Sequence, residues 1–181
     1  MQKLSSQELL FQYKGGKRNF DSVDLSQIDL FEANLSQANF SNSDFTNTHL
    51  PYANLSQVSF QNTALSQVEL SNSQLYQANF AQADMRQSNL SRANLRFADF
   101  SNANLAGANL QAADLSYANL SGANLSGANL ANANLSHTSF AGTQLAGANL
   151  FRAQNANIAA ANIDAATTLP DGHRPTDRGE S

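Results

Sequence analysis

Large apolar residues recur at every fifth position along most of this chain. From Phe20 to Leu150 each of these positions holds Leu or Phe, except Met85, which makes 27 consecutive units. The residue two places before each centre is mostly Ala, and otherwise small or β-branched from Ala33 onward. The residue directly before the centre is usually Asn or Asp, and the remaining two are mostly polar or Gly. The stretch SYANLSGANLSGANLANANL, residues 116–135, is typical of the whole.

A spacing of five fits neither a regular helix nor a straight strand. In an α-helix the apolar centres would spiral around the axis and share no buried face. In a straight strand alternate centres would point to opposite faces, because five is an odd number. The pattern instead predicts that each unit is a short extended segment followed by a corner. The centre and the small residue two places before it then both point inward.

The placement of Phe indicates how many units close one coil. Seven of the apolar centres are Phe, and only Phe45 lies away from a multiple of twenty. The other six are Phe20, Phe40, Phe60, Phe80, Phe100 and Phe140. Four units therefore form one coil, with these six side chains as a structural core along one wall. The prediction is an all-β fold, a quadrilateral parallel β-helix (solenoid) of about seven coils, about 32 Å long at the usual strand spacing.

The segment before the first unit predicts a helical cap. A solenoid exposes unpaired backbone groups at its ends, which caps usually cover. Ser5 and Glu8 have the spacing of a capping box. We therefore expect a short N-terminal capping helix that ends at Gly15-Gly16 and covers the first coil with Leu9, Leu10 and Tyr13.

The five-residue phase slips near the other end. Asn155 stands where the next apolar centre is expected, and the motif resumes three residues late as Ala-Asn-Ile at 156–158 and 161–163. This predicts either a partial last coil or a short Ala-rich helix. The predicted organisation is a cap and lead-in at 1–18, the β-helix at 19–155, a partial coil or cap at 156–169 and a disordered tail at 170–181.

The repeat A-(N/D)-L-x-x, as in ANLSG and ADLSY, resembles the pentapeptide-repeat family. The resemblance covers 20–150, and the opening LLFQYKGGKRNF is similar to the N-terminal segment of cyanobacterial members. The resemblance implies that the quadrilateral β-helix is right-handed. It implies no shared activity, because fold does not fix function.

Composition narrows the class of protein. The formal net charge of −4 is too small to indicate a nucleic-acid partner, and there is no Cys for disulfide or thiolate chemistry. Neither a secretory signal nor an apolar run of membrane-spanning length is evident, so we expect no membrane association and a cytoplasmic location.

Surface positions twenty residues apart should also stack in columns. One column holds Gln37, Gln57, Gln77, Phe97, Tyr117 and His137. Its first half predicts an amide ladder and its second half an exposed aromatic strip. The strip of Phe97, Tyr117 and His137 has two interpretations: a binding patch for a protein or a ring-bearing ligand, or stacking that only stabilises the column.

Two further pairings follow from the same spacing. His49 lies between Asp29 and Glu69 in one column, which predicts a local ion pair; a solvated imidazole is the alternative. Tyr76 and Arg96 are twenty residues apart, which predicts a cation–π pair.

No catalytic constellation, metal-binding motif or cofactor motif is recognisable, so we expect no enzyme activity, no metal and no cofactor. The favoured interpretation is a structural or protein-interaction module with an unknown protein partner, as a monomer or a weak end-to-end oligomer. The alternative comes from the resemblance, since some pentapeptide-repeat proteins mimic DNA and bind DNA gyrase, protecting it from quinolones. Nine acidic side chains against four Arg across 20–155 are sparse for such a mimic.

Overall fold

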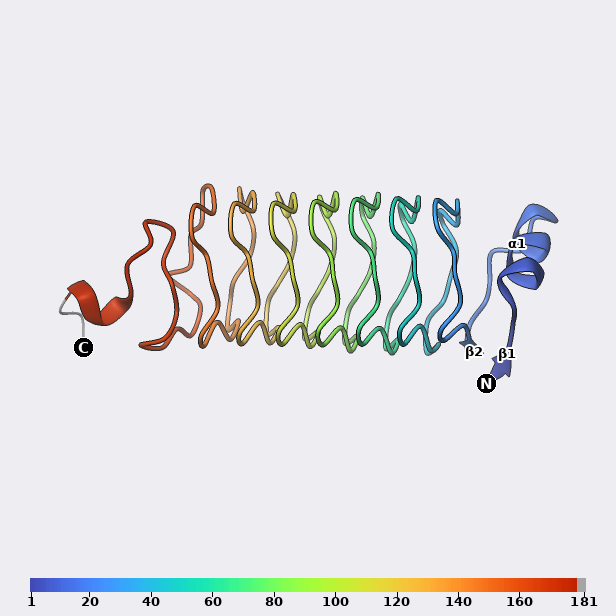
Figure 1. Cartoon of the computed structure of the whole chain (residues 1–181), viewed down its shortest axis with the longest axis horizontal. Helices are drawn as coiled ribbons and strands as arrows, with labels where there is room; N and C mark the ends of the chain where they lie inside the picture. The colour runs from blue at the N-terminus through green and yellow to red at the C-terminus, as the bar shows by residue number, and fades with distance from the viewer. Residues whose placement is uncertain (179–181) are drawn as a thin grey trace.

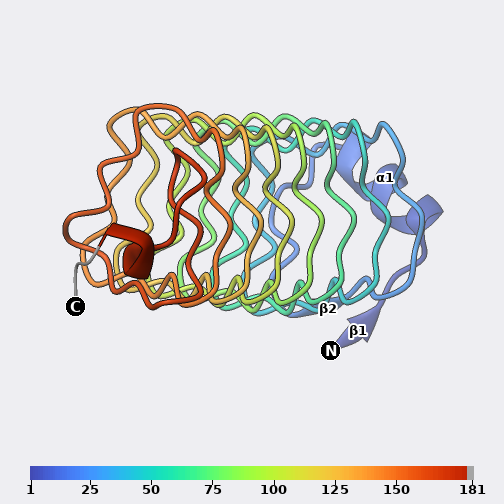
Figure 2. The same cartoon turned by 60° about the vertical axis from the view of Figure 1, so that its left-hand side comes forward.

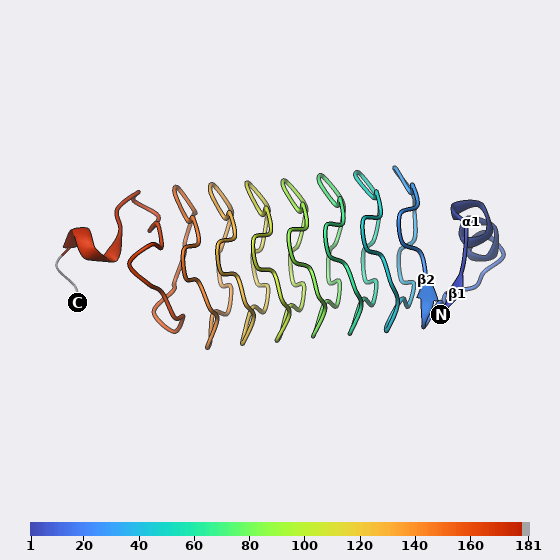
Figure 3. The ribbon, with the colours of Figure 1, turned by 60° about the horizontal axis from the view of Figure 1, so that its bottom comes forward.

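A computed structural model describes residues 1–178 as a long column of stacked coils (Figure 1). Helix α1, Ser6–Lys14, lies at the N-terminal end, and the 3-10 helix η1, Pro175–Arg178, lies at the other end. The two named strands are β1, Gln2–Lys3, and β2, Val23–Asp24, which pair in parallel. Figures 2 and 3 show that the coils have a nearly constant outline and spacing along the axis.

Neighbouring coils pair with an offset of twenty residues, as the sequence predicts. Isolated parallel bridges run from Asn19↔Asn39 to Asn134↔Gln154, with one bridged residue on each wall of a coil. The amide N–H of Phe60 donates to the carbonyl of Asn79 at 2.7 Å, and the N–H of Asn79 donates to the carbonyl of Val58 at 2.9 Å. The backbone hydrogen bonds of the walls therefore run along the column axis and leave the interior to side chains.

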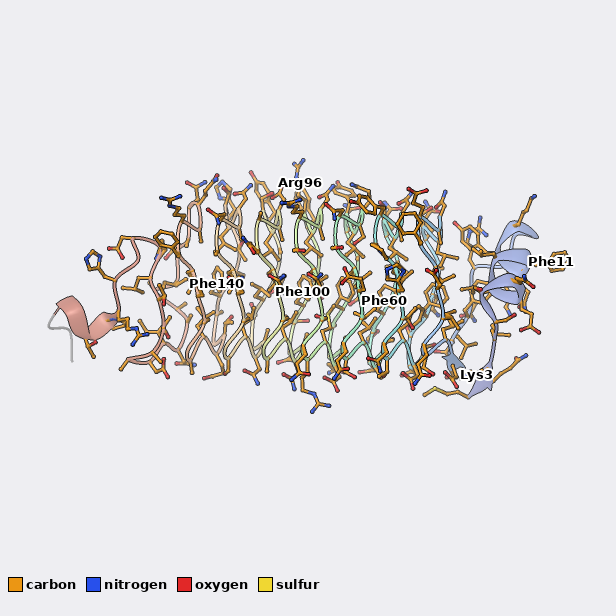
Figure 4. All side chains as sticks on the ribbon, viewed as in Figure 1. Lys3, Phe11, Phe60, Arg96, Phe100 and Phe140 are labelled. Atoms are coloured by element: carbon orange, nitrogen blue, oxygen red, sulfur yellow. The ribbon has the colours of Figure 1, made fainter. Side chains whose placement is uncertain are left out.

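All 27 apolar centres are buried, which confirms the inward face of each unit. Phe40, Phe60 and Phe80 stack at centroid distances of 5.7 and 5.4 Å, and Phe45 meets Phe60 edge-on at 5.0 Å. The labelled Phe60, Phe100 and Phe140 lie along the middle of the column in Figure 4. Buried Thr hydroxyls at the small position are satisfied, as when Thr63 donates to the carbonyl of Phe40 at 2.8 Å.

The corners account for the rest of the motif. The carbonyl of most centres accepts the N–H three residues later, as from Leu30 to Ala33 at 3.0 Å, and the second corner residue has a positive φ, as at Glu32 (55°). This is the hydrogen-bond pattern of a type II turn, which favours Gly or Asn at that position. The Asn or Asp before the centre accepts the N–H two residues later, as Asn119 does from Ser121 at 3.1 Å. The Asn119 side chain also donates to Asp99 at 3.0 Å, so it stabilises both the corner and the stack.

Helix α1 confirms the predicted capping box between Ser5 and Glu8 and the end at Gly15. Leu9 is fully buried, and the hydroxyl of Tyr13 donates to the carbonyl of Ser36 at 2.9 Å, so both cover the first coil. Leu10 differs from the prediction, because 39% of it is exposed instead of covering the first coil as Leu9 does.

The C-terminal segment continues the stack with a changed register. Gln144 bridges Asn162 and Asn149 bridges Thr168, so the offset falls from twenty to eighteen and then nineteen residues. A partial coil, rather than an Ala-rich helix, therefore follows the phase slip. The described part of the predicted disordered tail, 170–178, instead contains a turn, in which Leu169 donates to the carbonyl of His173 at 2.8 Å, and η1. Residues 179–181 of that predicted tail lie outside the described residues.

Candidate interaction surface

At one corner of the solenoid, the residues with positive φ present their side chains to solvent. These side chains form one continuous surface column. Gln37 donates to Gln57 at 3.1 Å, and Gln57 donates to Gln77 at 3.0 Å, which confirms the amide ladder. The ring of Tyr117 stacks on Phe97 at 4.9 Å and on His137 at 4.7 Å, with interplanar angles of 6° and 18°. Phe97 and Tyr117 are 42% and 48% exposed. The predicted aromatic strip is therefore present as a stack with its outer edge in water.

Two neighbours from the adjacent column widen this surface. Tyr76 meets Phe97 edge-on at 5.7 Å, and the guanidinium of Arg96 lies 5.9 Å from the Phe97 centroid. This corrects the expected pairing of Arg96 with Tyr76, since both contact Phe97 instead. Arg96 projects outward at the edge of the column in Figure 4. We refer to Tyr76, Arg96, Phe97, Tyr117 and His137 together as the aromatic strip surface.

A second exposed aromatic cluster lies nearer the N-terminal end. The ring of Phe31 lies 6.2 Å from His49 and 5.8 Å from Tyr52. Phe31 and Tyr52 are 50% and 56% exposed. The repeat spacing does not predict this cluster, because its members occupy neighbouring columns rather than positions twenty residues apart. The sequence does place Phe31, His49 and Tyr52 at adjacent corner and wall positions of two successive coils, and this arrangement could have indicated the cluster.

Charged groups on the column pair locally. Asp29 lies 2.9 Å from Nδ1 of His49, which confirms the expected contact between these two side chains, whereas Glu69 accepts hydrogen bonds from Ser71 and Asn89. Asp84 forms two short contacts, 2.7 and 2.8 Å, with the guanidinium of Arg86. Within residues 1–178 no group of three potential metal ligands converges. The surface therefore offers scattered pairs of opposite charge rather than one strong field.

The hydrogen bond from His49, followed by that from the Phe31 N–H, lowers the pKa of Asp29 below its ordinary value. A lowered carboxyl pKa gives a contribution to stability that is present above the ordinary pKa and is lost as pH falls through the lowered one. We expect His49→Ala, which removes the donor, to raise the Asp29 midpoint in a ¹³C-carboxyl NMR titration. The midpoint of Asp84, which the side chain of Arg86 lowers, is the internal control and should not move. An Asp29 midpoint that is equal in both proteins would contradict the pairing.

The fold and its surface define a β-solenoid repeat protein. A family model described as pentapeptide repeats, with eight copies, matches residues 88–127, 118–154 and 128–166. A second model, pentapeptide repeat region, matches 33–101. The chain belongs to the pentapeptide-repeat family, whose members fold as right-handed quadrilateral β-helices. This confirms the resemblance seen in the repeat.

Solved structures of the same family resemble the chain over most of its length. HetL, from the cyanobacterium Nostoc sp. strain PCC 7120 and involved in heterocyst differentiation regulation, is 27% identical, with 94% and 99% of the two chains covered and a TM-score of 0.37. Rfr23 from the cyanobacterium Cyanothece 51142 is 22% identical, with coverage of 90% and 98% and a TM-score of 0.26. QnrB1, a plasmid-mediated fluoroquinolone resistance protein, is 14% identical, with coverage of 90% and 89% and a TM-score of 0.40.

A search of curated proteins returned no match. Across residues 1–178, no helix combines the length and the apolar character needed to cross a membrane.

Proposed function

We propose that this protein is a non-enzymatic structural and protein-interaction module of the cytoplasm. In this proposal a rigid column of about seven coils displays polar faces and binds a protein partner through Phe97, Tyr117 and His137. The observation that carries the proposal is the continuous stack of exposed rings on a column whose other faces are mostly small and polar.

Exposed aromatic side chains are well suited to binding proteins. Aromatic rings bury a large area and are enriched among the residues that dominate interface energetics. The stacked rings at Phe97 and Tyr117 already restrict each other, which reduces the entropy lost when a partner binds. Tyr76 and Arg96 flank this stack and add two side chains that are common in interfaces.

The filled interior supports a structural role over catalysis. The centres are large apolar side chains that are fully or almost fully buried, and the residues two places earlier are small and buried. His49 and His137 lie in different coils and contact Asp29 and Tyr117 respectively, so each has a local surface role.

Mimicry of DNA toward DNA gyrase is the second function that the family suggests. Such a mimic needs a dense acidic surface, whereas Asp29, Asp84 and Asp24 are each paired with a basic group here. We therefore favour the interaction module. A supercoiling assay decides between them, because inhibition or quinolone protection of gyrase by this protein at micromolar concentration would support mimicry.

The triple variant Phe97→Gln, Tyr117→Gln, His137→Gln tests the interaction module. Gln already occupies three positions of the same column with φ values of 60°, 59° and 56°, so the variant should extend the ladder and keep the fold. We expect affinity purification from the native cell to recover a partner with the wild-type protein and to lose it with the variant. Loss of about tenfold or more in affinity is typical when aromatic anchors are removed.

A matched control changes a different amide ladder, which lies at another corner of the solenoid. Gln67 donates to Gln87 at 3.2 Å at a different corner, so Gln67→Ala, Gln87→Ala changes an amide ladder without touching the aromatic strip surface. This control should retain the partner. Identical partners for the wild-type protein and the triple variant would assign the strip to packing alone.

A further inference from the structure

The two ends of the column differ in shape and lie at opposite extremes of the molecule (Figures 1 and 3). Helix α1 covers one end, and residues 155–178 form the other. Between these ends the coils have four sides of five residues each and stack with a constant offset of twenty residues. Neither end can reach the other within one molecule.

The N-terminal end carries an apolar projection. Phe11 is 80% exposed and Leu10 is 39% exposed, although their neighbour Leu9 is fully buried against the first coil. Phe11 points away from the column beyond α1 in Figure 4. Lys14 lies three residues later and shares a helix face with Phe11.

The C-terminal end carries an apolar hollow. Its volume is about 580 Å³, and its lining includes Ile158, Ala161, Ile163, Leu169, Pro170 and Asp171. Of these lining residues, Ile163 is 41% exposed and Leu169 is 8% exposed. The residues that line this hollow follow the register change after Gln154, where the last coil leaves the twenty-residue path of the coils before it.

We propose that a second copy of this chain docks head to tail, with Phe11 of one molecule seated in the C-terminal hollow of the next. The ring of Phe11 projects from one end of the column, and the apolar hollow lies at the other end. A second copy shifted along the column axis would therefore bring its projecting ring, here called the knob, to the hollow of the first. Such a contact is heterologous, so it leaves a free knob and a free hollow and extends into chains. The association goes beyond the side-wall interaction and does not depend on it.

Charge supports a second copy as the occupant. Residues 1–18 carry four basic side chains and one acidic one, whereas 155–174 carry Asp164, Asp171 and Arg174 as their formally charged side chains. The end that bears the knob is therefore positive, and the end that bears the hollow is slightly negative. Lys14 beside the knob would approach Asp171 in the lining of the hollow, which lies 3.5 Å from Nδ1 of His173, so the contact should be sensitive to salt.

Sedimentation velocity over a concentration series tests the proposal. We expect the mean sedimentation coefficient of the wild-type protein to rise with concentration and to rise less at high salt. Phe11→Asp and Ile163→Asp should each weaken association by at least about tenfold, because each places a charge in the apolar contact. Both side chains are exposed in the monomer, so thermal melts should remain close to the wild type.

Mixing the two variants separates head-to-tail docking from the alternatives. Phe11→Asp retains an intact hollow and Ile163→Asp retains an intact knob, so an equimolar mixture should form a dimer that grows no further. Head-to-head pairing predicts instead that Ile163→Asp associates alone, and tail-to-tail pairing that Phe11→Asp does. Either of these results, or a wild-type coefficient that is independent of concentration, overturns the proposal.

Two further variants complete the design. Phe11→Ser removes the knob with a milder change and should repeat the Phe11→Asp result if that variant misfolds. The triple Gln variant of the side wall should associate like the wild type, because its substitutions lie away from both ends. Failure of the side-wall proposal therefore leaves this result unchanged, and the two proposals are tested separately.

Discussion

Phe60→Ala is expected to lower the free energy of unfolding by about 3–5 kcal/mol, the range for removing a buried aromatic ring. Phe60 is fully buried and contacts three other rings. Its centroid lies 5.7 Å from that of Phe40, 5.4 Å from that of Phe80 and 5.0 Å from that of Phe45. The coils above and below are fixed by backbone pairing, so they cannot collapse into the space that the ring leaves.

Chemical denaturation measures the loss, and hydrogen exchange locates it. Because each coil contacts only its neighbours, protection should fall most in the coils around Phe60 and less toward the C-terminal end. Phe60→Leu is the matched control, since Leu120 already occupies the same wall position within the stack and is fully buried. The control should lose clearly less stability. Equal losses for the two variants would contradict the cavity argument, because the aliphatic volume that Leu retains would then compensate nothing.

The repeat predicts so much of this fold because one packing requirement recurs in every unit. A side chain that must reach the centre of a narrow square coil has to return at each wall, which fixes the spacing of five. A wide side chain such as Phe is best accommodated next to another Phe, which gives the offset of twenty between Phe20 and Phe40. Surface columns such as Gln37 and Gln57 follow from the same offset.

Features that depend on side-chain conformation were less predictable. Arg96 has both Tyr76 and Phe97 within its reach, and the structure places its guanidinium over Phe97. Phe31 reaches sideways to His49 and Tyr52 instead of along its own column. A strict spacing rule identifies residues in one column, whereas contacts across columns depend on rotamers that the repeat does not fix.

The ends were harder to predict for a related reason. After Asn155 the apolar centre is lost, so backbone pairing alone sets the register, and it settles at offsets of eighteen and nineteen residues. In α1, Leu9 and Leu10 are adjacent and equally apolar, and only the docking angle of the helix decides which of them is buried. These are the places where the structure adds most to the sequence.

Leu9→Ala is expected to lower the free energy of unfolding of the N-terminal coils by about 2–5 kcal/mol, the range for removing a large buried aliphatic side chain. Leu9 is fully buried and packs with the apolar core at the end of the column, where no further coil covers Phe20 and Leu25. Removing its side chain opens the cap while the capping box at Ser5 and Glu8 stays intact. Native-state hydrogen exchange should therefore show faster exchange in the first coils.

Leu10→Ala is the matched control, because it makes the same chemical change at the next residue of the same helix. Leu10 is 39% exposed, so its replacement should change stability only slightly and leave exchange in the first coils as in the wild type. A difference between the two variants that is confined to the coils beside α1 supports the helix as a cap for that end. Equal exchange in both would mean that the first coil holds its own edge, with backbone pairing to β1 as the stabilising contact.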